Sequence, residues 1–186
     1  MERALLVMDF QVGIVERFGE RGASVLDRVN RAIGVARERG DAVIFVRVAF
    51  RPGTPEVSPS NVGFWSLTRQ VGWEEGSPTT ALHPSLQRLD SDVVVVKRRV
   101  SAFTGSDLEV VLRSLGVRQL TLAGISTSGV VLSTLRAAAD LDYSVSVLSD
   151  ACLDADDEVH RVLVEKVFPR QATVVTHDEW ASRAGS

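Results

Sequence analysis

The sequence predicts an α/β protein in which a parallel sheet carries helices on both faces. Short apolar runs alternate with helical patterns along most of the chain, and this alternation is typical of parallel strands joined by crossover helices. The chain has 186 residues, a length that suits one domain with a full core. We therefore expect a single domain over residues 1–186, with a loosely held tail from about residue 177.

The apolar runs predict six strands, because an uninterrupted apolar run is typical of a strand covered on both faces. These runs span residues 4–8, 42–48, 92–96, 120–125, 143–148 and 173–175. Helices are predicted where apolar residues recur three to four positions apart, over residues 23–39, 106–115, 128–141 and 156–168. Residues 50–80 are proline-rich and irregular, and long loops of this kind usually form lids or binding walls.

Composition and charge exclude several classes of protein. The net charge is −3 and no basic run is present, so we expect no nucleic-acid partner. The apolar run at residues 4–8 is too short for a signal or membrane segment. Cys152 is the single cysteine, which rules out an internal disulfide. These features predict a cytoplasmic protein that acts on a small molecule and has no membrane partner.

Two charged residues follow predicted strands, Asp9 after the first and Lys97 after the third. Ligands of parallel α/β sheets bind at the carboxyl ends of the strands, where the predicted turn at 124–128 also lies. Taken singly, Asp9 also fits a turn cap and Lys97 a solvated strand end. Their coincidence at one edge of the sheet favours a shared pocket.

Three segments carry a more specific pattern: VMDFQ (7–11), KRRVSAFTGSDL (97–108) and AGISTSGVVLSTLRAAAD (123–140). In order and spacing they resemble the isochorismatase-like superfamily, also called the cysteine hydrolases, from residue 4 to about residue 176. The resemblance implies a six-stranded parallel sheet in a three-layer α/β/α sandwich. It also implies a hydrolase and a homo-oligomer, either a dimer or a tetramer.

The resemblance assigns roles to individual residues. Asp9 matches the general acid/base aspartate, and Lys97 matches the lysine that holds this carboxylate ionised. The turn from Gly124 matches one with a cis peptide bond, here between Ile125 and Ser126. Its role would be to aim the backbone N–H groups of Ser126 and Val130 at a substrate oxygen.

Val130 marks a departure from that family pattern. In the amidase members of the superfamily the seventh residue of the motif that begins at Gly124 is the nucleophilic cysteine, and here it is Val130. Ser128, Ser133 or Cys152 would have to replace it, but helix spacing aims the serines elsewhere and free cysteines are commonly buried. The loop after the second strand, RVAFRPG, also lacks the Asp and His that metal-binding relatives place there. We therefore expect no metal and no cofactor.

The sequence thus favours acid–base hydrolysis of a small carboxylate- or carbonyl-containing molecule, without a covalent cysteine intermediate. The alternative is a catalytically inactive family member that serves as a ligand-binding or scaffold protein. Further polar and aromatic residues are candidates for substrate binding, with core or surface roles as the alternative: Gln11, Arg47, Phe50, Arg51, Phe64, Trp65, Trp73 and Arg99.

Overall fold

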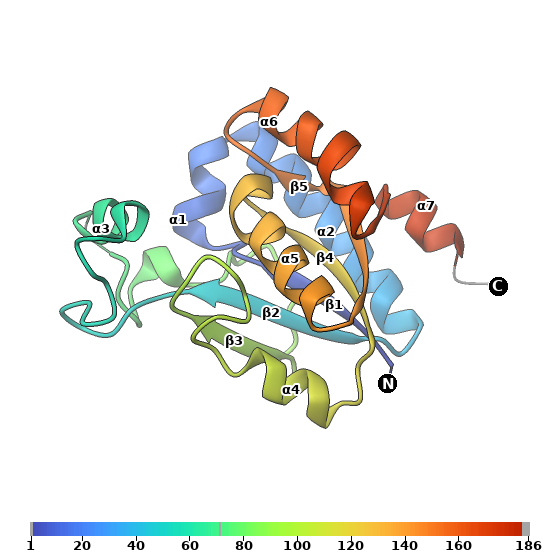
Figure 1. Cartoon of the computed structure of the whole chain (residues 1–186), viewed down its shortest axis with the longest axis horizontal. Coiled ribbons are helices and arrows are strands. Elements are labelled where there is room, and N and C mark those ends of the chain that lie inside the picture. Colours follow the sequence, from blue (N-terminus) through green and yellow to red (C-terminus); the bar gives the residue numbers. More distant parts are fainter. Residues whose placement is uncertain (1, 71, 184–186) are drawn as a thin grey trace.

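A six-stranded, all-parallel sheet forms the centre of the molecule, with strand order β3-β2-β1-β4-β5-β6. The computed structural model describes residues 2–70 and 72–183. The strands are β1 (Arg3–Met8), β2 (Ala42–Val48), β3 (Val93–Lys97), β4 (Gln119–Ile125), β5 (Ser144–Leu153) and β6 (Thr173–Val175). Helices lie on both faces of this sheet (Figure 1), so the predicted α/β class is confirmed.

Helical segments join the strands and differ in detail from the predicted ranges. The α-helices are α1 (Val12–Val15), α2 (Glu20–Glu38), α3 (Val62–Thr68), α4 (Leu108–Ser114), α5 (Leu132–Asp140), α6 (Asp157–Val162) and α7 (His177–Ser182). Three segments are 3₁₀ helices, η1 (Glu16–Phe18), η2 (Pro78–Thr80) and η5 (Phe168–Arg170), and two are π-helices, η3 (Thr127–Val131) and η4 (Leu163–Val167). The predicted helix over 128–141 therefore begins as the wider turn η3 before it becomes α5.

Two hydrophobic cores form because alternate side chains of each strand point to opposite faces of the sheet. On one face Leu6 and Met8 of β1 pack with residues of α4, α5 and η4. On the other face Leu5 and Val7 pack with residues of α2 and with Trp180 of α7. Both faces of the central strand are thus buried, as its continuous apolar sequence predicts.

The strand order changes direction at β1, which lies between β2 and β4. The chain runs outward from β1 to β3 and then returns to β4 on the other side of β1. Met8 pairs with Val46 on one side and with Gly124 on the other. A crevice beyond the carboxyl ends of strands at such a point is the usual ligand site of α/β proteins.

The C-terminal segment is a helix. Thr176 and Glu179 form a capping box that starts α7, and the guanidinium carbon of Arg39 lies 4.2 Å from the ring centroid of Trp180. Trp180 is buried against α2. The structure thus has a capped helix at residues 177–182, where the sequence predicts a loosely held tail, while residues 184–186 of that tail lie outside the described part of the chain.

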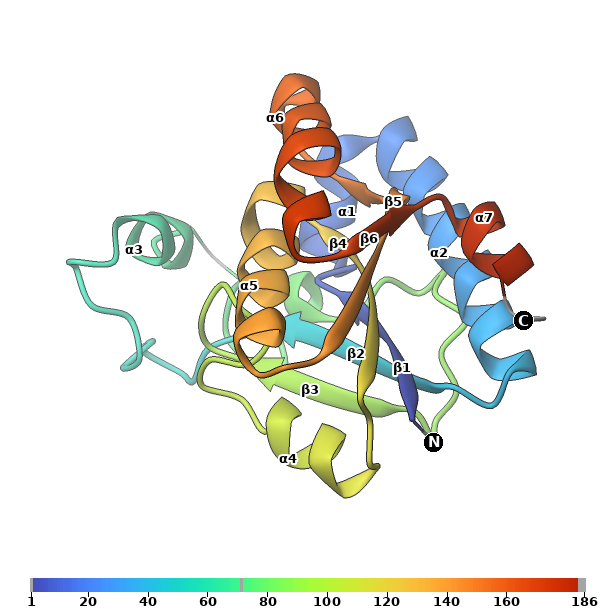
Figure 2. The ribbon, with the colours of Figure 1, turned by 45° about the vertical axis from the view of Figure 1, so that its right-hand side comes forward.

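The irregular section between β2 and β3 forms an arm that carries α3. Both views show α3 standing away from the sheet (Figures 1 and 2). The base of the arm has its own small core of Val48, Phe50, Val57, Phe64 and Trp73. This core fixes the arm beside the carboxyl edge of the sheet. None of the helices in the described residues has both the length and the apolarity needed to cross a bilayer.

Candidate active site

Asp9 and Lys97 meet at the carboxyl edge of the sheet. Asp9 directly follows β1 and Lys97 ends β3, so the two residues approach each other across the end of β2. Lys97 Nζ lies 2.9 Å from Asp9 Oδ2, and it donates a second hydrogen bond of 3.0 Å to the Arg99 carbonyl. The residues are only 5% and 2% exposed, respectively. An ion pair this deeply buried has a large desolvation cost, so it is weak evidence for a purely stabilising role.

The backbone of Asp9 adopts a conformation that is uncommon for a residue with a side chain. Its φ is 61°, in the left-handed region where aspartate is tolerated better than most residues. The Asp9 N–H donates to the Val46 carbonyl at 2.8 Å, which extends the pairing of β1 with β2. Backbone strain of this kind is concentrated at functional sites.

The two carboxylate oxygens of Asp9 have different surroundings. Oδ2 faces Lys97, whereas Oδ1 is buried and has no hydrogen-bond partner among the described residues. Burial raises the pKa of the Asp9 carboxyl above its usual value, and the charge and hydrogen bond of Lys97 act against this rise. A carboxyl group with a raised pKa holds its proton closer to neutral pH, which is what a general acid requires.

A cavity of about 430 Å³ opens in front of this ion pair. Most of its wall is apolar. The lining residues are Asp9, Ile14, Arg17, Phe18, Val48, Phe64, Leu67, Trp73, Lys97, Val100, Ile125, Ser126, Gly129, Val130 and Ala155. A small number of polar groups in an apolar cavity of this size is typical of a site for a small molecule.

A larger hollow of about 660 Å³ lies at the opposite edge of the sheet, among residues such as Gly116, Gln119 and Ser144. It is formed where β4 and β5 begin, away from the carboxyl ends of the strands. Its one lining carboxylate, Asp142, also has a positive φ, of 63°, but unlike Asp9 it is exposed to solvent. We therefore place the candidate active site at the smaller cavity.

The turn between β4 and α5 forms one wall of the cavity. The peptide bond between Ile125 and Ser126 is cis. The Ser126 hydroxyl accepts a hydrogen bond of 3.1 Å from the Gly129 N–H, and the Ser128 N–H donates to Asp154 Oδ2 at 2.7 Å. Val130 is 2% exposed and lines the cavity. The wall therefore presents an isopropyl group at the position where the superfamily resemblance expects a thiol.

Several residues predicted to bind substrate lie outside the cavity wall. Gln11 is fully buried, and its amide group bonds the Val48 N–H, the Val48 carbonyl and the Thr80 carbonyl. Phe50 lies beneath the wall, with its ring 5.4 Å from that of Phe64. Trp65 is 37% exposed on α3. Of the predicted aromatic residues, Phe64 and Trp73 line the cavity.

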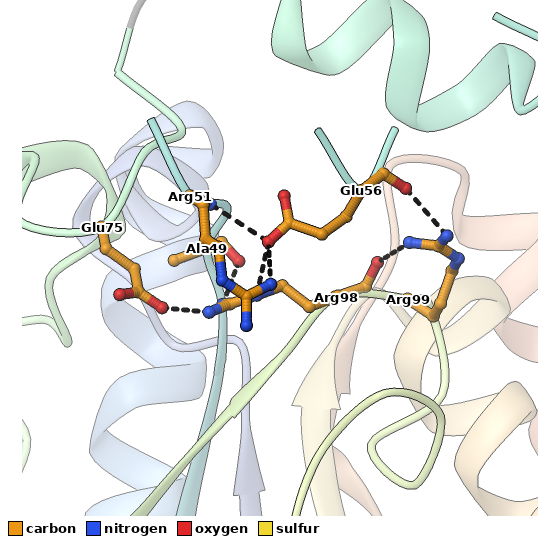
Figure 3. A network of polar contacts seen from close by, with 6 residues as sticks. All are labelled: Ala49, Arg51, Glu56, Glu75, Arg98 and Arg99. Atoms are coloured by element: carbon orange, nitrogen blue, oxygen red, sulfur yellow. Dashed lines mark hydrogen bonds and ion pairs between the residues drawn. The ribbon is translucent and has the colours of Figure 1, made fainter. Parts of the chain in front are cut away.

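The predicted anion-binding arginines instead hold the arm against the sheet. Arg51 and Arg98 both contact the Glu56 carboxylate, and Arg99 Nη2 donates to the Glu56 carbonyl at 2.8 Å (Figure 3). Arg98 also contacts the Ala49 carbonyl and Glu75, while Arg47 Nη1 donates to the Thr80 carbonyl. These bonds connect the residues that follow Lys97 to both ends of the arm.

Glu56→Gln is expected to destabilise the protein by about 1–2 kcal/mol at neutral pH, because it weakens the charge-assisted hydrogen bond from Arg51 and removes the ion pair with Arg98. Burial alone would raise the pKa of Glu56, but hydrogen bonds from its own segment and from Arg51 outweigh burial and lower it. A carboxyl group whose pKa is lowered by folding stabilises the folded state, and this stabilisation is lost as the pH falls through its folded-state pKa. The difference between wild type and variant in urea unfolding should therefore shrink as the pH is lowered.

Glu165→Gln is the matched control for this variant, since Glu165 pairs with Arg161 on the exposed surface and exposed pairs contribute little. The role given to Glu56 would be wrong if both variants unfolded at the wild-type urea concentration.

Cys152 lies apart from the cavity wall. It pairs with Gly124 through the β4–β5 ladder and packs in the core next to α5. Burial raises the pKa of the Cys152 thiol to about 12, so almost no thiolate forms near neutral pH. Within residues 2–70 and 72–183, no three His, Cys, Asp or Glu residues are grouped so that they could hold a metal ion.

Iodoacetamide is therefore expected to leave native wild-type protein unlabelled, because it reacts with thiolates. Val130→Cys should add one rapidly labelled thiol, since position 130 lines the cavity near Lys97. Intact mass and peptide mapping after a short exposure distinguish the two sites. Labelling of native wild-type protein at Cys152 would contradict this description of the thiol.

Arg17 lies on η1 and lines the cavity, although the sequence pattern did not mark it as a site residue. The available signal was its place in the segment that directly follows Asp9, but residue spacing alone does not show where an arginine side chain points. The missed apolar residues Ile14 and Phe18 come from the same segment.

Comparison with known proteins agrees with this architecture. The family model for the isochorismatase domain matches residues 3–179. A ureidoacrylate amidohydrolase, RutB, from Stutzerimonas stutzeri is 31% identical over 84% of this chain and 72% of the relative. A probable inactive nicotinamidase from Arabidopsis thaliana is 30% identical over 96% of this chain and 94% of the relative.

A solved structure extends the similarity to three dimensions. An isochorismatase family protein from Burkholderia thailandensis has a TM-score of 0.84 and 28% identity, with 100% of this chain and 96% of that chain covered. Together with the domain match over residues 3–179, this similarity shows that the chain belongs to the isochorismatase family.

Proposed function

We propose that this protein is a hydrolase that acts on a small carboxylate- or carbonyl-containing molecule, with Asp9 as general acid and base. Lys97 orients and charge-balances the Asp9 carboxylate. The backbone N–H groups of Ser126 and Val130 bind the substrate oxygen. No covalent bond to a cysteine is part of the reaction.

The observation that carries this proposal is the unpartnered oxygen of Asp9. Oδ1 is buried without a hydrogen-bond partner among the described residues, and Asp9 lines the cavity. An unsatisfied buried carboxylate oxygen is costly, and a proton or a substrate group delivered through the cavity would satisfy it. The raised pKa of Asp9 supports the same role.

In the proposed reaction Asp9 donates one proton and later takes one back. The protonated carboxyl donates its proton to the substrate as the scissile bond breaks. Water then adds to the electrophilic carbon, and the carboxylate takes one proton from that water, which returns Asp9 to its starting state. Acid–base catalysis of this kind needs no nucleophile at position 130.

A panel of small carboxylates that contain an amide, ester or enol-ether bond tests this proposal. Wild-type protein is expected to release product from at least one class, and Val130→Ala should retain that activity because the side chain of Val130 supplies only apolar surface. Turnover that is absent in Val130→Ala but present in wild type would contradict the purely apolar role of this side chain.

A non-catalytic ligand-binding protein is the second candidate. Val130 at the cavity wall and the similarity to a relative named as a probable inactive nicotinamidase favour it. Members of the same panel would then bind, as seen by perturbed NMR signals of cavity residues, but none would be converted. Product from any member that depends on Asp9 would exclude this second candidate.

A further inference from the structure

Arg17 places a positive charge on the cavity wall in addition to the Asp9–Lys97 pair. It belongs to η1, and its guanidinium carbon lies 5.4 Å from the ring centroid of Trp73. Arg17 Nη2 donates one hydrogen bond of 3.1 Å, to Gln70 Oε1. Stacking on an indole orients a guanidinium group and leaves its outer N–H donors able to bind a ligand.

The charge of Arg17 is not neutralised by its neighbours. No aspartate or glutamate oxygen within residues 2–70 and 72–183 lies within 4.0 Å of its guanidinium, in contrast to Arg51 and Arg98. When Asp9 is ionised, its charge and that of Lys97 cancel, so the lining residues carry one net positive charge, and protonation of Asp9 adds a second. Arginine binds carboxylates through two parallel hydrogen bonds.

Apolar surface makes up most of the wall that Arg17 shares with Asp9. Ile14, Phe18 and Phe64 are among the lining residues. A ligand that satisfies this wall has an apolar body and an anionic end. A wholly polar ligand would leave the aromatic and aliphatic surface without a partner, and a neutral ligand would leave the guanidinium without one.

We infer that Arg17 binds the carboxylate of the substrate and thereby selects small amphipathic carboxylates over their neutral analogues. This inference rests on the proposed function for its reaction but not for its binding step. In the bound state the carboxylate lies at Arg17, the apolar body lies against Phe64 and Trp73, and the scissile bond lies at Asp9. Arg17 is thus a specificity-determining residue.

Benzoate and benzamide are matched probes, because they share a ring and differ in charge. Wild-type protein is expected to bind benzoate about tenfold more tightly than benzamide, as followed by Trp fluorescence and by NMR titration. Arg17→Met should abolish this preference. Arg17→Lys should retain part of it, because lysine keeps the charge but loses the paired donors.

Arg69→Met is the matched control variant. Arg69 also stacks on a tryptophan, with its guanidinium carbon 5.9 Å from the ring of Trp65, but it is not among the residues that line the cavity. The Arg69 variant is expected to keep the full benzoate preference. Circular dichroism and thermal unfolding verify that all three variants are folded.

Three results would each overturn the inference: wild-type protein binds benzoate and benzamide equally, wild-type protein binds neither probe, or folded Arg17→Met keeps the full preference for benzoate. The binding assay needs no turnover, so its result is independent of the acid–base proposal. A benzoate preference that depends on Arg17, found together with no product from any substrate, would refute the proposed reaction and retain the role of Arg17.

Discussion

Asp9→Asn is expected to lower turnover by about 10²–10⁴-fold, the range that general acid–base catalysis contributes. Asparagine has nearly the same shape as aspartate but neither donates nor accepts a proton at the relevant pH. The loss should appear mainly in kcat, because the cavity wall and Arg17 still bind the substrate. Steady-state kinetics with any substrate identified from the panel measure the effect.

Stability measurements are needed beside the kinetics, because this substitution also leaves Lys97 charged and buried without its carboxylate. Breaking a buried ion pair costs about 3–5 kcal/mol. Kinetics should therefore be measured at a temperature where circular dichroism shows the variant to be folded. Full activity in folded Asp9→Asn would contradict the role of Asp9.

Lys97→Met is expected to destabilise the protein by about 3–5 kcal/mol at pH 8, because Asp9 then stays buried without a cation. Burial already raises the pKa of Asp9, and Lys97 opposes this rise, so the variant should have a still higher Asp9 pKa. A carboxyl group whose pKa is raised by folding stabilises the folded state fully at pH values below its unfolded-state pKa. This stabilisation is lost as the pH rises through its folded-state pKa. The destabilisation should thus be much smaller at pH 4 than at pH 8.

The double variant Asp9→Asn with Lys97→Met provides the control, since it removes both buried charges. Replacement of a whole buried pair is often neutral or stabilising, so the double variant should be more stable than Lys97→Met at pH 8, while turnover stays low. Urea unfolding at both pH values measures this. Equal stability of wild type and Lys97→Met at pH 8 would show that the Asp9 carboxylate is not desolvated.

The sequence was sufficient to predict the sheet and the meeting point of its polar ends. Continuous apolar runs mark strands that are covered on both faces, and parallel strands end at a common edge. Asp9 and Lys97 lie 88 positions apart in sequence (97 minus 9) and are nevertheless joined at 2.9 Å. The alternation of strands with helices indicates a common strand direction, which places both residues at one edge of the sheet. Their contact also depends on the strand order, in which β1 and β3 flank β2.

Phe64, Trp73 and the turn at 124–130 were predicted and line the cavity. The rest of the wall could not be predicted, because its side chains are placed by contacts between distant loops. Gln11 is two residues from Asp9 but bonds Val48 and Thr80. Arg99 is two residues from Lys97 but bonds the Glu56 carbonyl. Arg17, by contrast, reaches the cavity through its stacking on Trp73. Such pairings depend on loop conformation, for which a single sequence carries no periodic signal.

The final helix was missed for a related reason. The segment at 177–182 is too short for a clear helical period, and its stability comes from the Thr176 capping box and from Trp180 packed against α2. The first of these signals is present in the sequence as Thr176 followed by Glu179. The second depends on the position of α2.

Single-turnover hydrolysis in H₂¹⁸O tests the central claim most directly, that Asp9 moves protons and forms no covalent intermediate. Direct attack by water predicts that ¹⁸O enters the product alone and that the peptides containing Asp9 and Cys152 keep their unlabelled, unmodified masses. Incorporation of ¹⁸O into the Asp9 carboxyl, or a substrate-derived adduct on either peptide, would contradict the account.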